Sequence, residues 1–143
     1  MKKRLSALIP LILLLAGCGG RDVPKIDEYT WEMTSVQSIE ENGQAVAYGE
    51  RGHSILADAV QLDMDCVAEN GVLTVTDHTN QITYTGTYRL RNTDPRAVSY
   101  DIVLDGKEGI AVAAMTTYHD GAQNFTFIMD LGDYAINFFA AEE

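Results

Sequence analysis

From Tyr29 onward, apolar and polar residues alternate in short runs, and this period of two constrains the fold more than any other feature. The clearest run has apolar residues at every second position, with polar residues between them: Val60, Leu62, Met64 and Cys66 against Gln61, Asp63 and Asp65. Successive side chains of a β-strand point to opposite faces, so the run predicts a strand with one apolar face. Similar patterns recur as far as Phe139, which predicts an all-β chain.

Tight-turn sequences separate these runs, notably Asn70-Gly71 and Asp105-Gly106. Such pairs supply the positive φ that hairpin turns need, and hairpins join antiparallel neighbours. We therefore expect eight or nine strands in an up-and-down meander. Closure into an eight-stranded barrel removes the exposed edges of such a sheet, and a two-sheet β-sandwich is the alternative. One segment, Ser54 to Val60, fits a helix or a strand.

The first residues have the organisation of an export signal. Lys2, Lys3 and Arg4 precede an apolar stretch from Leu5 to Ala16, which at about a dozen residues is shorter than the roughly 20 that a membrane-spanning helix needs. The stretch ends in Leu15-Ala16-Gly17-Cys18, which resembles the lipobox of bacterial lipoproteins. The resemblance implies cleavage before Cys18, diacylglyceryl transfer to its thiol, and acylation of the new terminus by a fatty acid such as palmitate.

These features predict three parts of the chain: a signal peptide at 1–17, a lipidated Cys18 with a flexible tether to residue 28, and a folded domain at 29–143. The protein is then expected outside the cytoplasm, anchored to a bacterial cell membrane through its lipid. Loss of residues 1–17 would change the formal charge from −11 to −14, because three basic residues are removed. So acidic a surface repels phosphate backbones and argues against a nucleic-acid partner.

Two segments of the expected domain resemble lipocalin-like, calycin-type barrels. One is Tyr29-Thr30-Trp31-Glu32-Met33, with its early Trp, although Tyr29 stands where those barrels usually have Gly. The other is the Gly-Thr-aromatic strand Tyr84-Thr85-Gly86-Thr87-Tyr88-Arg89-Leu90. The resemblance spans about residues 29–139. It implies an eight-stranded antiparallel barrel, with Trp31 plugging one end and a ligand at the open mouth.

The candidate ligand-binding residues are apolar or aromatic: Trp31, Met33, Tyr84, Tyr88, Tyr100 and the exposed Tyr118. An eight-stranded barrel is just wide enough to be filled by side chains or to hold one small ligand. The bulk of Trp31, Met64, Tyr84, Tyr88 and Tyr100 favours a filled interior, and the hollow alternative stays open.

The sequence contains no constellation typical of catalysis or metal binding. The three histidines, His53, His78 and His119, fall in expected turns or loops without metal-ligand spacing. Asp63, Asp65 and Glu69 lack a calcium-loop pattern and read as a solvated face. Cys66 shares the apolar face of its strand and is expected in the core as an inert thiol. We therefore predict no catalytic residues, no cofactor and no metal, and a protein that is not an enzyme.

Two functions fit these expectations. The first is a lipid-anchored module that binds a small apolar or amphipathic ligand inside its barrel. The second is a protein-interaction or inhibitor module whose acidic surface meets a basic partner in the cell envelope, because opposite charges speed association.

Overall fold

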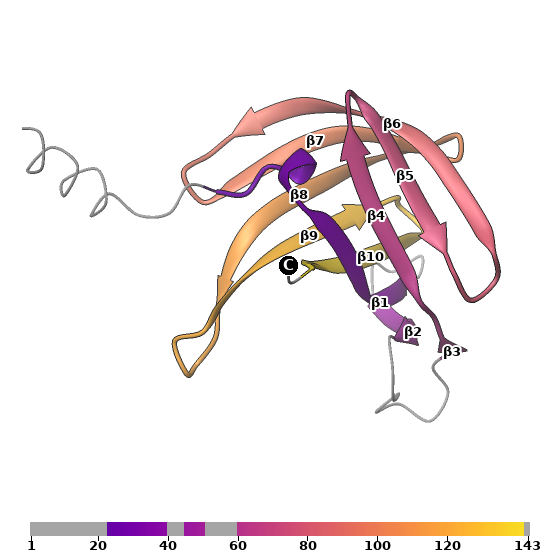
Figure 1. Ribbon diagram of the computed structural model, residues 1–143, viewed down its shortest axis with the longest axis horizontal. Helices are drawn as coiled ribbons and strands as arrows, with labels where there is room; N and C mark the ends of the chain where they lie inside the picture. Colours follow the sequence, from indigo (N-terminus) through magenta and orange to yellow (C-terminus); the bar gives the residue numbers. More distant parts are fainter. Residues whose placement is uncertain (1–22, 40–44, 51–59, 142–143) are drawn as a thin grey trace, which may run out of the picture.

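The computed structural model describes residues 23–39, 45–50 and 60–141, which form a single sheet and one short 3-10 helix (Figure 1). The elements are η1 (Ile26–Glu28), β1 (Thr30–Ile39), β2 (Ala45–Glu50), β3 (Val60–Gln61), β4 (Met64–Glu69), β5 (Val72–Asp77), β6 (Ile82–Thr93), β7 (Ala97–Leu104), β8 (Lys107–Thr117), β9 (Gln123–Asp130) and β10 (Tyr134–Ala140).

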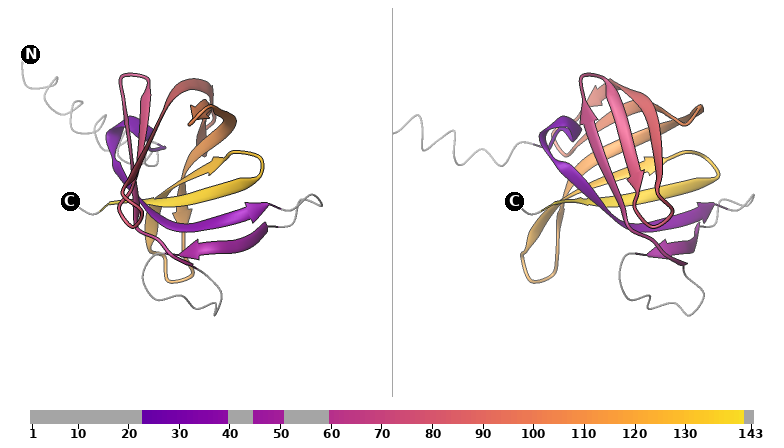
Figure 2. Two further views of the ribbon diagram at one scale, coloured as in Figure 1. Left: turned by 90° about the vertical axis from the view of Figure 1, so that its right-hand side faces the viewer. Right: turned by 45° about the vertical axis from the view of Figure 1, so that its right-hand side comes forward.

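Eight of these strands close into an antiparallel up-and-down barrel. Strands β4 to β10 pair in chain order, and β1 closes the ring by pairing with β10 on one edge and β4 on the other. Figure 2 shows the strands wrapped around one interior. The predicted all-β barrel is confirmed, a β-sandwich is not formed, and the architecture is compatible with a lipocalin-like fold.

Strand β1 pairs with β4 at one end of the barrel only, because β1 changes its neighbour part-way along. The first residues of β1 pair with β4 over three positions, Thr30 to Glu32, and the rest of that edge, from Ser35 to Ile39, pairs with β2. A register shift between Met33 and Ser35 marks the place where β1 bends, as β-bulges do. Strand β2 in turn carries β3 in parallel. The seam between β1 and β4 therefore parts toward one end of the barrel.

The period of two in the sequence becomes the inside and outside of the barrel. Along β7, Val98, Tyr100, Ile102 and Leu104 are buried and the residues between them are half-buried. The run of Leu62, Met64 and Cys66 also faces the core. In β8, which is apolar on both faces, Ala111 and Ala113 point inward while Ile110 and Val112 lie outside. These small inward residues leave room for the rings of the residues paired with them, Tyr100 on β7 and Phe127 on β9.

Two hairpin turns have the predicted geometry. Asn70 and Gly71 have φ of 50° and 80°, and Asp105 and Gly106 have φ of 50° and 78°. Both residues of each pair have positive φ, as in the type I′ turns whose twist matches the adjoining strands.

Gly86 serves a different purpose, since its φ is not in the left-handed region. A Cβ at this position would lie 1.8 Å from the carbonyl oxygen of Val103 on β7. The long strand β6 can therefore approach β7 this closely only with Gly at position 86.

The folded body begins earlier than predicted. Residues 24–28 were expected in the flexible tether, but Pro24 and Ile26 are fully buried, and η1 packs against the barrel. The apolar Ile26 and the rigid Pro24 explain this, because both lose apolar exposure by covering the barrel end. The segment 54–59, for which helix and strand were both open, lies outside the described residues, as do the turn at 41–43, His53 and Cys18.

Candidate functional site

One end of the barrel is plugged by the chain's own N-terminal segment. The indole Nε1–H of Trp31 donates a hydrogen bond to the carbonyl oxygen of Ile26 at 2.9 Å, and the backbone N–H of Ile26 donates to the hydroxyl of Tyr100 at 3.3 Å. Burial raises the pKa of the Tyr100 hydroxyl. These bonds hold η1 across the end where β1 begins and β10 ends (Figure 1). We call this the closed end.

Aromatic rings fill the interior behind this plug. Trp31 lies 5.2 Å from Phe127, and Phe127 stacks on Phe138 at 5.5 Å between ring centroids. Tyr88 and Tyr100 meet edge to face at 5.9 Å. Such tilted and edge-to-face pairs are the favoured arrangements of buried rings. The interior of the barrel nearest η1 is therefore packed with aromatic side chains.

A cavity of about 540 Å³ lies toward the opposite end, where the seam between β1 and β4 parts. It is lined by apolar and polar side chains from nearly every strand around it: Val36, Ser38, Ile39, Leu62, Met64, Val75, Asp77, Asn80, Tyr84, Leu104, Asp105, Asp133, Tyr134 and Ile136. Pockets that hold small molecules have volumes of roughly 300–1,000 Å³ and a mostly apolar lining with a few placed polar groups. The sequence favoured a filled interior and left a hollow one open; at this end of the barrel the structure has a cavity, lined in part by Met64 and Tyr84.

The polar groups come from three turns that the meander brings to the open end. Asp77 is only 4% exposed, and its two carboxylate oxygens accept hydrogen bonds from the backbone N–H and the side-chain Nδ2 of Asn80, at 3.0 and 2.8 Å. Asp105 comes from the β7–β8 turn and Asp133 from the β9–β10 turn. Three carboxylates thus line a cavity whose inner wall is apolar.

Lys107 neutralises one of these carboxylates. Its Nζ lies 2.8 Å from Oδ2 of Asp133 and 4.8 Å from the ring centroid of Tyr134. The hydrogen bond raises the pKa of Lys107 and lowers that of the Asp133 carboxyl, while burial raises the pKa of Tyr134. Three carboxylates against one ammonium leave the cavity lining with an excess of two negative charges.

The structure separates the predicted ligand-binding residues. Tyr84 lines the cavity. Trp31 and Met33 are fully buried in the core, and Tyr100 is buried at the closed end with Tyr88 against it. Tyr118 is exposed at the β8–β9 turn. Apart from Tyr84, these residues do not line the open-end cavity, and their role in binding stays a prediction.

Sequence reasoning missed most of the cavity lining, including Asp77, Asp133 and Tyr134. A signal for them was present: in a meander, every second turn lies at the same end of the barrel. The turns after Asp77, Leu104 and Asp130 therefore had to share one end. What the sequence did not show is that η1 blocks the other end.

Cys66 lies in the core, as predicted. It is fully buried and free, and burial raises the pKa of its thiol to about 12, so it is protonated at neutral pH and chemically inert. His78 is an exposed turn residue, as predicted, and it also pairs with Asp65 on the outer face, with 2.7 Å between Nε2 and Oδ2.

Within the described residues, no group of three or more His, Cys, Asp or Glu side chains could hold a metal ion. The same part of the chain contains no helix that is long and apolar enough to cross a membrane. No protein-family model matches the chain, and searches of curated proteins and of solved structures give no significant match. The barrel and its cavity therefore carry the functional argument.

Proposed function

We propose that this protein is an exported, lipid-anchored, non-enzymatic binding protein that holds a small apolar or amphipathic ligand in the open end of its barrel. The observation that carries the proposal is the 540 Å³ cavity, whose inner wall includes Val75, Leu104 and Ile136. Burying a ligand methylene against such a wall contributes about 0.8 kcal/mol. An alkyl chain of about ten carbons would then gain roughly 8 kcal/mol from burial, from which the cost of association must be subtracted.

The proposed anchor agrees with the direction in which the chain enters the barrel. The described chain begins at Val23, which packs against the core beside η1 at the closed end. A lipid on Cys18, five residues earlier, would therefore hold the closed end toward the membrane. The cavity would then open away from the bilayer, where it can exchange ligand with the surroundings.

Ligand binding is tested with N-phenylnaphthylamine, a neutral apolar dye that becomes fluorescent when it leaves water. The purified domain should raise its fluorescence with saturable binding. Leu62→Trp places a larger side chain in the cavity and should weaken binding at least about tenfold. Ile128→Trp, on the outer face where Ile128 is 43% exposed, is the matched control and should bind normally. Absence of saturable dye binding, or equal affinity in all three proteins, would overturn the proposal.

The anchor is tested separately by substituting each cysteine. Cys18→Ser should abolish incorporation of an alkyne-labelled fatty acid and release the exported protein from the membrane fraction. Cys66→Ser is the control and should remain labelled and membrane-bound. A protein that stays labelled after Cys18→Ser would contradict lipidation at this position.

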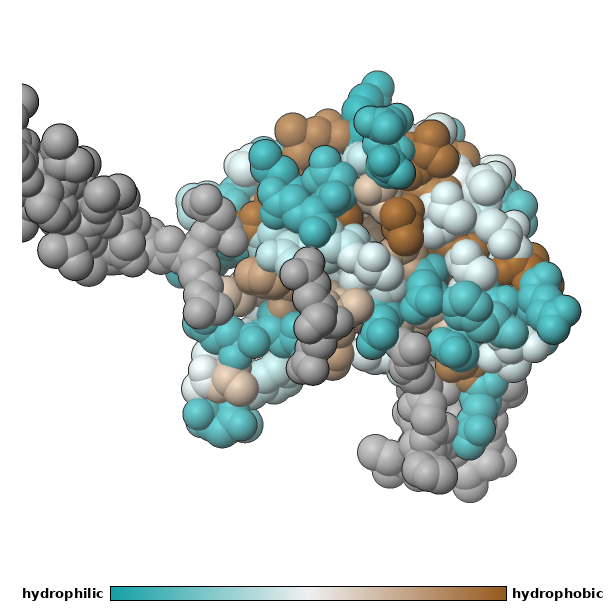
Figure 3. All heavy atoms as spheres, in the orientation of Figure 1, coloured by the Kyte–Doolittle hydropathy of each residue, from teal (hydrophilic) through white to brown (hydrophobic). Residues whose placement is uncertain are grey.

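A second candidate function is an interaction module for a basic envelope protein. The formal charge of −11 favours a basic partner, and the outer face of β8 and β9 offers an apolar contact surface, since Ile110 and Ile128 are each more than 40% exposed and Val112, half-buried, pairs with Ile128. Figure 3 shows apolar patches scattered among hydrophilic side chains on another face, which is the ordinary state of a protein surface. Cross-linking in envelope extract at low and high salt would test this function, with Ile128→Asp as the disrupting variant.

A further inference from the structure

The charges around the open-end cavity would determine which head group a bound amphiphile carries. This inference rests on the proposed function. An alkyl chain would fit the apolar inner wall whatever head group it carried. The head group must then lie among the cavity's polar residues, which include Asp77, Asp105 and Asp133. Their chemistry decides which head group is compatible.

A carboxylate or phosphate head group would be repelled there. The lining carries three carboxylates, and its nearby cation, Lys107, is already paired with Asp133 at 2.8 Å. The whole chain has a formal charge of −11, which adds to the unfavourable potential. A buried anion without a partner is costly, so a fatty-acid anion would lose much of the energy gained by burying its chain.

An ammonium head group would instead be attracted to the carboxylates of the lining. Asp77 is nearly buried and is held in place by its two hydrogen bonds from Asn80, while carboxylates keep further acceptor capacity. Asp105 adds a second negative charge from the β7–β8 turn. Tyr84 supplies an aromatic ring in the same lining.

Lys107 shows a primary ammonium paired with one of these carboxylates at the exposed rim of the cavity. Its Nζ lies between the carboxylate of Asp133 and the ring of Tyr134, at 2.8 Å and 4.8 Å. The remaining part of the lining offers the same two kinds of group, a carboxylate at Asp105 or Asp77 and a ring at Tyr84. A ligand ammonium would therefore contact a carboxylate and an aromatic ring, as Lys107 contacts Asp133 and Tyr134.

We propose that the open-end cavity binds single-chain cationic amphiphiles of the alkylammonium class in preference to neutral or anionic ones. The alkyl chain lies against the apolar wall and the ammonium lies among Asp77, Asp105 and Tyr84.

The test compares three ligands with the same chain: decylammonium, decanol and decanoate, each competing with bound N-phenylnaphthylamine. Decylammonium should bind at least about tenfold more tightly than decanol, as one charge-assisted contact allows, and decanoate should bind most weakly. The preference should shrink at high salt, because the cavity opens to solvent.

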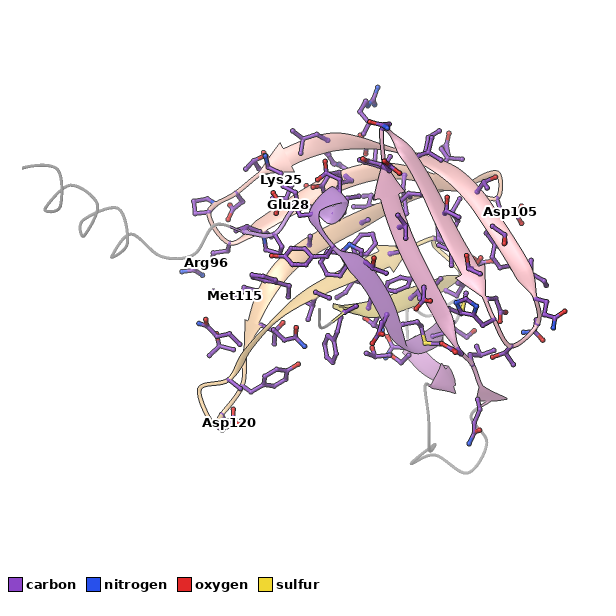
Figure 4. All side chains as sticks on the ribbon, in the orientation of Figure 1. Lys25, Glu28, Arg96, Asp105, Met115 and Asp120 are labelled. Carbon is purple, nitrogen blue, oxygen red and sulfur yellow. The ribbon has the colours of Figure 1, made fainter. Side chains whose placement is uncertain are left out.

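Asp105→Asn is the diagnostic variant, because Asn tolerates the positive φ of position 105 and the turn should survive. It should lower decylammonium affinity about fivefold or more and leave decanol unchanged. Asp120→Asn is the matched control, since Asp120 lies at the β8–β9 turn, far from Asp105 (Figure 4). It should leave all three affinities unchanged.

The outcomes separate this inference from the proposed function. If the dye and decanol bind but decylammonium has no advantage, or Asp105→Asn has no selective effect, the charge selectivity is overturned and the proposed function stands. If neither the dye nor any decyl compound binds, the proposed function itself fails.

Discussion

Replacing Gly86 with Ala should lower the free energy of unfolding of the barrel by more than the addition of a single methyl group would suggest. The new Cβ would lie 1.8 Å from the carbonyl oxygen of Val103, 2.8 Å from its carbonyl carbon and 2.9 Å from Cα of Leu104. Ordinary carbon–oxygen contacts are about 3.3 Å or longer, so the strands must separate by about 1.5 Å. All three contacts are with backbone atoms, and no side chain can rotate away.

The cost can be estimated from overpacked cores, where added groups cost about 1–3 kcal/mol and occasionally more. Because the strain falls on the backbone pairing of β6 with β7, we expect the upper end, about 3 kcal/mol. For a domain of this size, that loss lowers the melting temperature by roughly 10 °C. Stability is measured by urea unfolding, followed by circular dichroism and by the fluorescence of Trp31.

Gly106→Ala is the matched control. It also adds one methyl, at a turn where nothing lies within 4 Å but φ is +78°. The strain of a non-Gly residue in this conformation costs about 1 kcal/mol. If Gly86→Ala were within about 0.5 kcal/mol of the unmodified protein, or no worse than Gly106→Ala, the close pairing of β6 with β7 would be refuted.

Three further predictions concern the core and the cavity. Trp31→Phe keeps a ring but removes the donor to the Ile26 carbonyl, so urea unfolding should show a loss of about 1–3 kcal/mol; an unchanged midpoint would contradict the plug at the closed end. Burial raises the pKa of the Cys66 thiol from 9.0 to about 12, so the folded state holds its proton more tightly and stability falls as pH rises through that range; this part of the slope should vanish in Cys66→Ala, and identical slopes would contradict it. The carboxyl of Asp133 should titrate below its usual range by NMR and return toward it in Lys107→Met; an unmoved titration would exclude the ion pair.

The fold could be predicted from the sequence because its signals are local. Alternation decides which side chains face inward, and Asn70-Gly71 and Asp105-Gly106 decide where the chain reverses. Closure followed from the need to remove sheet edges. The seam between β1 and β4 did not follow, because the bend of β1 depends on a register shift and on its pairing with β2, which no local pattern encodes.

The candidate site was harder to predict because it depends on contacts between distant residues. Trp31 was expected both to plug one end and to bind ligand, and only the structure shows that η1 completes the plug, since Ile26 is hydrogen-bonded to Trp31 and to Tyr100. Asp77 and Asp133 look like ordinary turn residues, and only the closed barrel brings them to one cavity. Tyr84 was correctly expected to face the interior, because the alternation along β6 places its side chain on the inward face of the strand.

The location of a bound alkyl chain tests the account most directly. In isotope-filtered NMR of the domain with decylammonium, the chain protons should show nuclear Overhauser contacts to methyl groups of Leu62, Leu104 and Ile136, which line the cavity. Contacts instead to Val112 and Ile128 on the outer face of β8 and β9 would contradict an internal site and would favour a surface that binds partners.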